Sequence, residues 1–276
     1  MFKTLVNAWK VADLRKKILF TVAILVIYRF GNAVPIPFIN ADALAQLFAD
    51  NGENVFYGYL NLLTGGSFTQ CTIFALSITP YITASIIVQL LTMAIPALER
   101  MIKEGGEEGR KKIASITRFV TIALGLLQST AYFFYLRSQG YLVKDAAGAN
   151  FTGFAAVFQA IVIILCFTAG TALIMWLGER INENGIGNGI SMILFAGIVS
   201  RIPTLITTLF GPENGYIRLG GPYYFLSPFV AICLILMIAF IVWMDNAERR
   251  VPVQYAKRVV GRKMYGGQST HIPMKV

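Results

Sequence analysis

The chain has 276 residues, of which 56% are hydrophobic and 14% are charged, and its mean hydropathy is +0.63. A soluble domain carries about 25% charged residues, so this composition excludes an ordinary soluble globular protein and indicates a protein of the lipid bilayer. The net charge of +10 leaves nucleic acid open as a partner until the placement of the basic residues is considered.

The N-terminal region predicts an arm followed by a first membrane span. Residues 1–17 are typical of a cytosolic amphipathic arm, with Leu5, Ala8, Trp9 and Ala12 at helical spacing. The apolar run that begins at Ile18 follows three basic residues, as in a signal peptide. No small-residue cleavage site follows it, so we interpret residues 18–34 as a retained first span.

A second apolar segment, residues 56–69, is too short to cross a bilayer as a helix. Irregular backbone at membrane depth must be buried in protein or line a wet cavity. We therefore expect a re-entrant or pore-lining segment here.

Five further spans are predicted at 72–98, 119–136, 154–177, 188–210 and 223–244. Pro80 predicts a kink in the first of these, and the glycine-rich residues 183–189 predict a tight turn before the span at 188–210. The basic tail, residues 245–276, alternates in the manner of β-strands. The predicted organisation is thus an arm (1–17), spans one to five (18–210), an outer loop with span six (211–244) and the tail. The predicted fold class is an all-α polytopic membrane protein with six transmembrane helices.

The placement of the basic residues predicts the orientation. With a cytosolic N-terminus, all but five of the 24 Lys and Arg residues fall on the cytosolic side. The five exceptions are Arg29, Arg137, Lys144, Arg201 and Arg218. This strong positive-inside bias indicates that the charge sets topology, so we expect no DNA partner.

Residues suited to catalysis or metal binding are scarce. The one histidine, His271, lies in the tail, and the three cysteines, Cys71, Cys166 and Cys233, have neither metal spacing nor a disulfide framework. We expect no enzyme, no metal site and no cofactor. The spans lack Asp, Glu, Lys and His, and we expect Arg29 and Arg201 to snorkel at the outer ends of spans one and five.

Four segments together resemble the SecY family, the pore subunits of bacterial protein-conducting channels. They are RFGNAVPIPFIN (29–40), FALSITPYITASIIVQLL (74–91), WLGERINENGIGNGISMILFAGIVSRIP (176–203), and VPVQYAKRVVGR with QSTHIPMKV (251–262 and 268–276). The resemblance implies a fold of ten spans in two inverted halves. It also implies that this chain holds the first half, the sixth span and the following cytosolic loop.

The resemblance implies a pore ring of bulky aliphatic side chains. Ile82 and Ile86 are four residues apart in the second span, and Ile190 and Leu194 have the same relation in the fifth. These four residues are the ring candidates, although ordinary helix packing gives the same spacing. A hydrophobic constriction resists ions by dewetting, and its flexible side chains can part around a passing polypeptide.

A plug and a lateral gate follow from the same resemblance. The segment 56–69 matches the plug, with Leu60, Leu62, Leu63, Gly65 and Gly66 as its residues. Gln128 resembles the polar gate residue, and Gln89 is a second gate candidate for which helix packing is an alternative.

The tail resembles the cytosolic loop that docks on the ribosome or on the SecA motor. The docking candidates are Arg249, Arg250, Lys257, Arg258, Arg262 and Lys263, which suit ribosomal RNA phosphates or an acidic surface. Implied partners are SecE, SecG, SecA, the ribosome, signal peptides, nascent chains and lipid. The implied location is the bacterial cytoplasmic membrane.

The family function is passage of unfolded secretory proteins across the membrane and of membrane proteins sideways into it, driven by SecA or the ribosome. Two alternatives remain at this stage. A secondary transporter of small solutes needs an ionisable group within the bilayer, and a membrane scaffold needs no pore.

Overall fold

The computed structural model describes residues 9–40, 64–68, 70–144, 151–211, 223–253, 258–260, 263–265 and 270–275. The chain divides into two compact units, Met1–Ile202 and Pro203–Val276, which are described separately.

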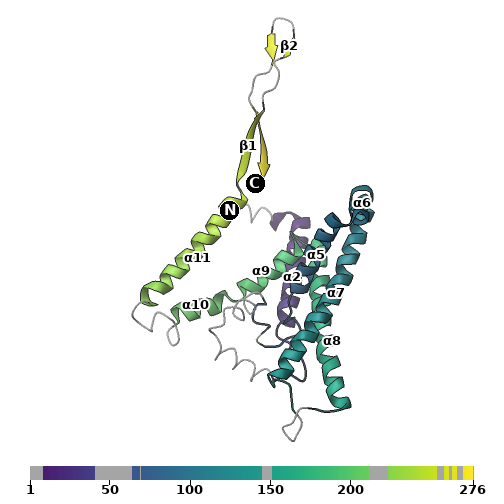
Figure 1. The fold of residues 1–276 in the computed structure, drawn as a ribbon. Coiled ribbons are helices and arrows are strands. Elements are labelled where there is room, and N and C mark those ends of the chain that lie inside the picture. Colours follow the sequence, from purple (N-terminus) through teal and green to yellow (C-terminus); the bar gives the residue numbers. More distant parts are fainter. Residues whose placement is uncertain are drawn as a thin grey trace. The chain divides into compact units, whose positions relative to one another are not determined.

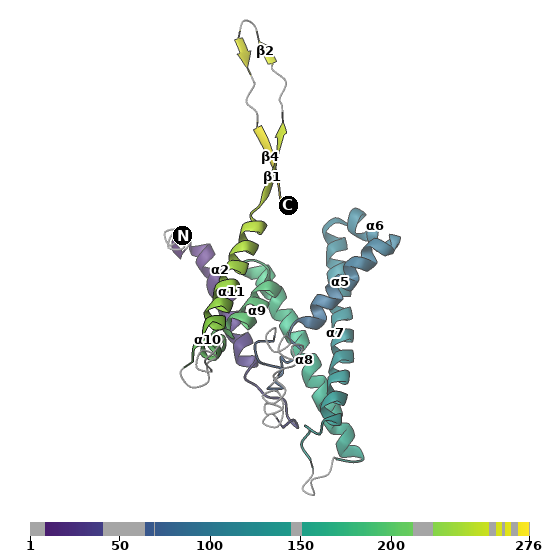
Figure 2. The same ribbon diagram turned by 60° about the vertical axis from the view of Figure 1, so that its left-hand side comes forward.

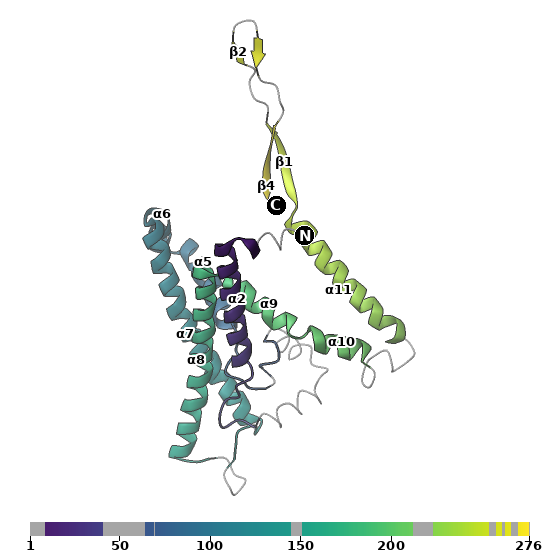
Figure 3. The same ribbon diagram turned by 180° about the vertical axis from the view of Figure 1, so that it is seen from behind.

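The first unit is a helical bundle of α2 (Ala12–Gly31), α5 (Thr79–Ala94), α6 (Pro96–Glu104), α7 (Gly106–Ser138), α8 (Phe154–Asn184) and α9 (Gly189–Val199). Helices α7 and α8 run side by side, with α5 against α7 (Figures 1 and 2). Helix α2 packs on α8 and α9, as the view from behind shows (Figure 3).

Two predictions for the second span are wrong. Residues 72–78 form turns instead of helix, and α5 begins at Thr79, so Pro80 occupies the first turn of a helix and not a kink. Proline suits this position because its missing N–H is not needed there. A second proline, Pro96, begins α6, and α5 and α6 meet at an angle of 96°.

Small and hydroxylated residues bring α7 and α8 together. Ser129 and Thr168 lie 3.0 Å apart between their hydroxyl oxygens, and a Cβ on Gly125 would meet the Thr171 methyl group at 3.6 Å. Such residues let two helix backbones approach closely inside a membrane, where apolar lipid gives helices no hydrophobic reason to associate.

The turn before α9 is confirmed and has a clear local cause. Gly187 has φ +75°, and the Asn188 side chain then caps α9 by accepting from the backbone N–H groups of Ile190 and Ser191. The predicted fifth span is not one continuous helix. Helix α9 ends at Val199, and α10 (Ile202–Phe210) begins after Ser200 and Arg201.

Two clusters of buried side chains form the core of the first unit. The α7 cluster gathers around Phe133, Leu136, Ile163 and Phe167. The α9 cluster comes from α2, α8, α9 and the turns that precede α5, and it consists of Ile24, Tyr28, Phe74, Ile78, Ile174, Leu177, Ile181 and Ile193.

The second unit contains most of α10, the long helix α11 (Tyr223–Asp245) and a basic hairpin (Figure 2). Strand β1 (Glu248–Val253) pairs antiparallel with β4 (Thr270–Lys275), and β2 (Arg258–Val260) pairs antiparallel with β3 (Lys263–Tyr265).

In the described part of the chain, four helical segments are long and apolar enough to cross a membrane: Gly106–Ser138, Phe154–Asn184, Gly189–Phe210 (α9 with α10) and Tyr224–Asp245. The bent pair α5 and α6 makes five if it counts as one span. Helix α2 also reaches the length of a span, but it contains Arg15, Lys16, Lys17 and Arg29.

Candidate functional site

Three of the four ring candidates pack on one cluster of buried side chains. Ile82 of α5 and the pair Ile190 and Leu194 of α9 are partly buried and pack against the same α9 cluster. A different local feature positions each of the two helices. Ile82 lies in the first turn of α5, and α9 is held against α8 because Gly189 abuts the Gly178 carbonyl, where a side chain would collide.

The fourth candidate, Ile86, lies apart from them. Its side chain is 52% exposed and is not among the residues that pack on the α9 cluster. Ile82 and Ile86 share one face of α5, and Ile86 lies one turn further along the helix than the residue that packs on the cluster.

The plug candidates fall partly outside the described residues, since Leu60, Leu62 and Leu63 are not among them. Gly65 and Gly66 are described and have φ +64° and +95°, so both adopt the left-handed backbone that glycine tolerates. The turn that contains them, residues 64–68, is buried throughout.

Arg29 and Arg201, which were expected to snorkel at span ends, both lie beside the turn of residues 64–68. The Arg29 Nη1 atom lies 3.2 Å from Ser200 Oγ and 3.5 Å from the Gly65 carbonyl oxygen. Arg201 is half-buried, and its guanidinium lies where a Cβ on Gly66 would be. Hydropathy placed these arginines at span ends but gave no sign that both would lie on the same glycine turn.

The gate candidates lie in the first unit and the docking candidates in the second. Gln128 is half-buried on α7, and Gln89 is exposed on α5. Arg249 and Arg250 are exposed on β1, Arg258 and Lys263 lie in β2 and β3, and Lys257 and Arg262 lie outside the described residues.

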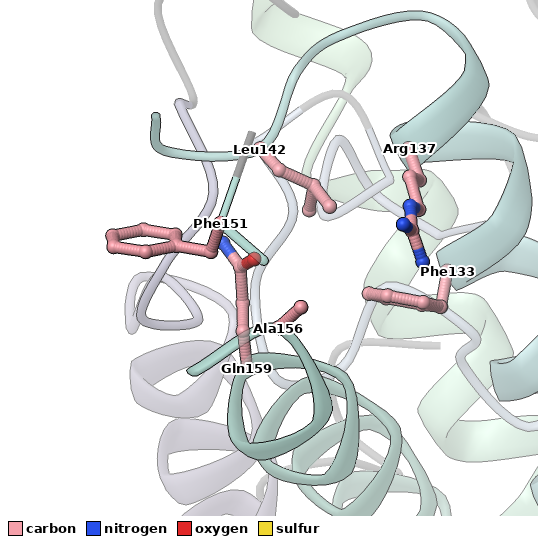
Figure 4. A pocket seen from close by; sticks show the side chains of 6 residues that line it. All are labelled: Phe133, Arg137, Leu142, Phe151, Ala156 and Gln159. Atoms are coloured by element: carbon pink, nitrogen blue, oxygen red, sulfur yellow. The ribbon is translucent and has the colours of Figure 1, made fainter. Parts of the chain in front are cut away.

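A small pocket lies between the C-terminal end of α7 and the N-terminal end of α8 (Figure 4). It is lined by Phe133, Arg137, Leu142, Phe151, Ala156 and Gln159. The buried Gln159 donates from Nε2 to the Val143 carbonyl at 3.2 Å, which fixes its amide as part of the wall. No group of His, Cys, Asp and Glu suited to a metal occurs within the described ranges.

Comparison with known proteins decides the family. A sequence model of SecY matches residues 72–276. The chain belongs to the SecY family. A relative, the protein translocase subunit SecY of Streptomyces galbus, is 42% identical over 277 aligned residues. The alignment covers 100% of this chain and 62% of that SecY, so the chain spans less than two thirds of its relative.

Solved structures show the same fold at lower identity. A protein-conducting channel matches with a TM-score of 0.57 and 21% identity, over 96% of this chain and 54% of that one. Sec61 in the canine ribosome-channel complex matches with a TM-score of 0.55 and 21% identity, over 88% of this chain and 50% of that one. This SecY-family chain is therefore a mainly helical, multi-pass membrane protein with the channel fold.

Proposed function

We propose that the protein is the central pore subunit of a Sec translocon. In this role it passes unfolded secretory proteins across the bacterial cytoplasmic membrane and releases membrane proteins sideways into lipid. It is a passive, non-enzymatic channel, and SecA or the translating ribosome supplies the energy.

One observation carries the proposal. In a SecY-family chain, aliphatic side chains from two helices far apart in sequence converge on one apolar cluster: Ile82 from α5, and Ile190 and Leu194 from α9. Such a constriction excludes water and hydrated ions at rest. The side chains are only partly buried, so they have room to part when a polypeptide enters.

The topology follows from charge and span length. We infer six spans, formed by α2, α5 with α6, α7, α8, α9 with α10, and α11, with the N-terminus in the cytosol. The apolar part of α2 begins after Lys17, and the exposed Arg249 and Arg250 follow α11, so both groups of cations lie on the cytosolic side.

The remaining roles are proposed with it. Residues 56–69 act as the plug, and Gln128 with Gln89 line the lateral gate. The hairpin that carries Arg249, Arg250, Arg258 and Lys263 docks on SecA or on ribosomal RNA. The Sec61 structure, which is a ribosome-channel complex, supports a ribosome as partner. SecE and SecG complete the channel.

Site-specific crosslinking tests the function. A photoreactive amino acid replaces Ile82 or Ile190 in the full-length channel, and a secretory chain is stalled in transit. We expect both positions to crosslink to the stalled chain, whereas Leu173, which is 45% exposed on α8, should crosslink to lipid only. Equal labelling of the chain from all three positions, or from none, argues against a pore at the α9 cluster.

A further inference from the structure

Three segments that are distant in sequence meet at one point of the first unit. They are the last turn of α2 with Arg29, the turn of residues 64–68, and the end of α9 with Ser200 and Arg201. Arg29 joins all three, because its Nη1 atom lies within hydrogen-bond distance of Ser200 Oγ (3.2 Å) and of the Gly65 carbonyl (3.5 Å). We call this set of contacts the Arg29 tie.

The turn lies on the ring-bearing face of α9. Ile190, Leu194 and Gly197 are spaced four and three residues apart and so share one face of that helix. A Cβ on Gly65 would be 3.0 Å from the Gly197 carbonyl and 3.1 Å from Ser200 Oγ. Two glycines in contact thus place the turn of residues 64–68 on α9, about one helical turn beyond Leu194.

Helix electrostatics explain why two arginines tolerate each other here. Arg29 lies in the last turn of α2, and Arg201 directly follows Ser200, the C-cap of α9. The carboxyl end of a helix carries a partial negative charge of about half an electron, which attracts a cation. The carboxyl ends of α2 and α9 lie close to this point, so they offset part of the repulsion between the two guanidinium groups.

The turn region also contains buried polar groups that lack partners. Within the described residues, the Asn32 side-chain amide, at the C-cap of α2, and the Ser67 hydroxyl are buried and make no hydrogen bond. An unpaired buried polar group destabilises the arrangement that contains it. The closed arrangement of the turn therefore depends on contacts from outside, and Arg29 provides them.

We propose that Arg29 is a positioning residue that holds the turn of residues 64–68 over the ring candidates and so keeps the resting channel sealed. This proposal rests on the proposed function and adds a residue to it. The tie spans α2 and α9, so a shift of α9 away from α2 breaks it. The turn is then released at the same moment as Ile190 and Leu194 move apart from Ile82.

The test measures ion flux through full-length channels in liposomes without any substrate. Arg29→Ala removes the donor, and Arg137→Ala, at the exposed end of α7, is the matched control. Loss of a charged hydrogen bond implies an increase of about tenfold or more in the open population, so we expect a rise of that order in resting flux for Arg29→Ala only. Arg29→Lys restores part of the seal, because lysine keeps the charge but loses the planar fork.

A second readout follows the turn itself. Cys71 follows this turn and is 1% exposed, and with Cys166 and Cys233 replaced by alanine it reports opening by its alkylation rate. We expect Arg29→Ala to speed alkylation of Cys71 and Arg137→Ala to leave it unchanged. Gly65→Ala, which crowds the Gly197 backbone, should resemble Arg29→Ala, while Gly140→Ala shares a positive φ but meets no neighbour.

The outcomes separate this proposal from the proposed function. Crosslinking of a stalled chain to Ile82 establishes the pore independently of Arg29. If that crosslink forms, and Arg29→Ala changes neither resting flux nor Cys71 alkylation, the positioning role is overturned and the pore stands. Faster alkylation without extra flux overturns it as well, because the turn then moves without opening the seal.

Discussion

Helices α8 and α11 are both long and apolar, yet they are buried to very different degrees. Helix α8 buries eleven of its residues, whereas none of the described side chains of α11 is buried. Hydropathy alone therefore does not predict which helix packs inside the protein.

The difference lies in the size and polarity of the side chains. Helix α8 buries Thr168, Gly170, Thr171 and Gly178, which allow close approach or hydrogen bonds. Helix α11 presents large apolar groups such as Ile235 and Trp243, which are 66% and 70% exposed. Lipid solvates large apolar groups as well as a protein core does, so small and hydroxylated residues decide where helices meet.

Gly170 gives the largest expected contrast between the two helices. A Cβ at this position would collide with the backbone carbonyl of Ile73, and a backbone cannot move aside as a side chain can. We expect Gly170→Ala to destabilise the protein by about 3 kcal/mol, at the upper end for overpacking. Thermal unfolding in detergent measures this, with Ala239→Val on the exposed face of α11 as the control. Equal midpoints for the two variants would remove the contrast.

The Ser129–Thr168 pair gives an intermediate effect. The Ser129 hydroxyl donates to the Gly125 carbonyl and lies within hydrogen-bond distance of the Thr168 hydroxyl, so Ser129→Ala removes one polar neighbour from each. We expect Ser129→Ala to destabilise the protein by about 1 kcal/mol. Side-chain hydrogen bonds between membrane helices contribute less to stability, on average, than their strength in an apolar medium would suggest. A double-mutant cycle with Thr168→Val should give a coupling free energy that stabilises the folded protein. A coupling of zero would show that the two hydroxyls act separately.

The Arg118–Glu179 ion pair should have the smallest effect. Its atoms lie 2.7 Å apart between α7 and α8, but the two side chains are 46% and 21% exposed. Solvent screening limits such a pair to about 0.2–1 kcal/mol, measured as the coupling of Arg118→Ala with Glu179→Ala. Raising the salt concentration should weaken the coupling further. A coupling that survives high salt unchanged would mean that this edge of the bundle is drier than its exposure indicates.

Much of the fold was predictable because a membrane span is recognised from the hydropathy averaged over about 20 consecutive residues. The helical bundle and the start of α11 at Tyr223 agree with the sequence. The start of α5 did not, because residues 72–78 are as apolar as a span. Their turns depend on Cys71 and Ser77 at positive φ, and tertiary packing holds both in place.

The candidate site was predictable only in part. Spacing placed Ile190 with Leu194 and paired Ile82 with Ile86, but it could not tell that only Ile82 faces the α9 cluster. The contacts of Arg29 were hidden for another reason. They depend on the meeting of Gly65 with Gly197, a pairing over more than a hundred residues that no local pattern encodes.

The central claim is that the side chains on the α9 cluster form the ion seal of a channel. The most direct measurement is the resting conductance of full-length channels in a planar bilayer, comparing Ile82→Ser with Leu194→Ser and with Phe195→Ser. Phe195 is the neighbour of Leu194 and is 60% exposed. We expect ion leakage from the first two variants and a closed channel for Phe195→Ser. Closed channels in all three variants would contradict it.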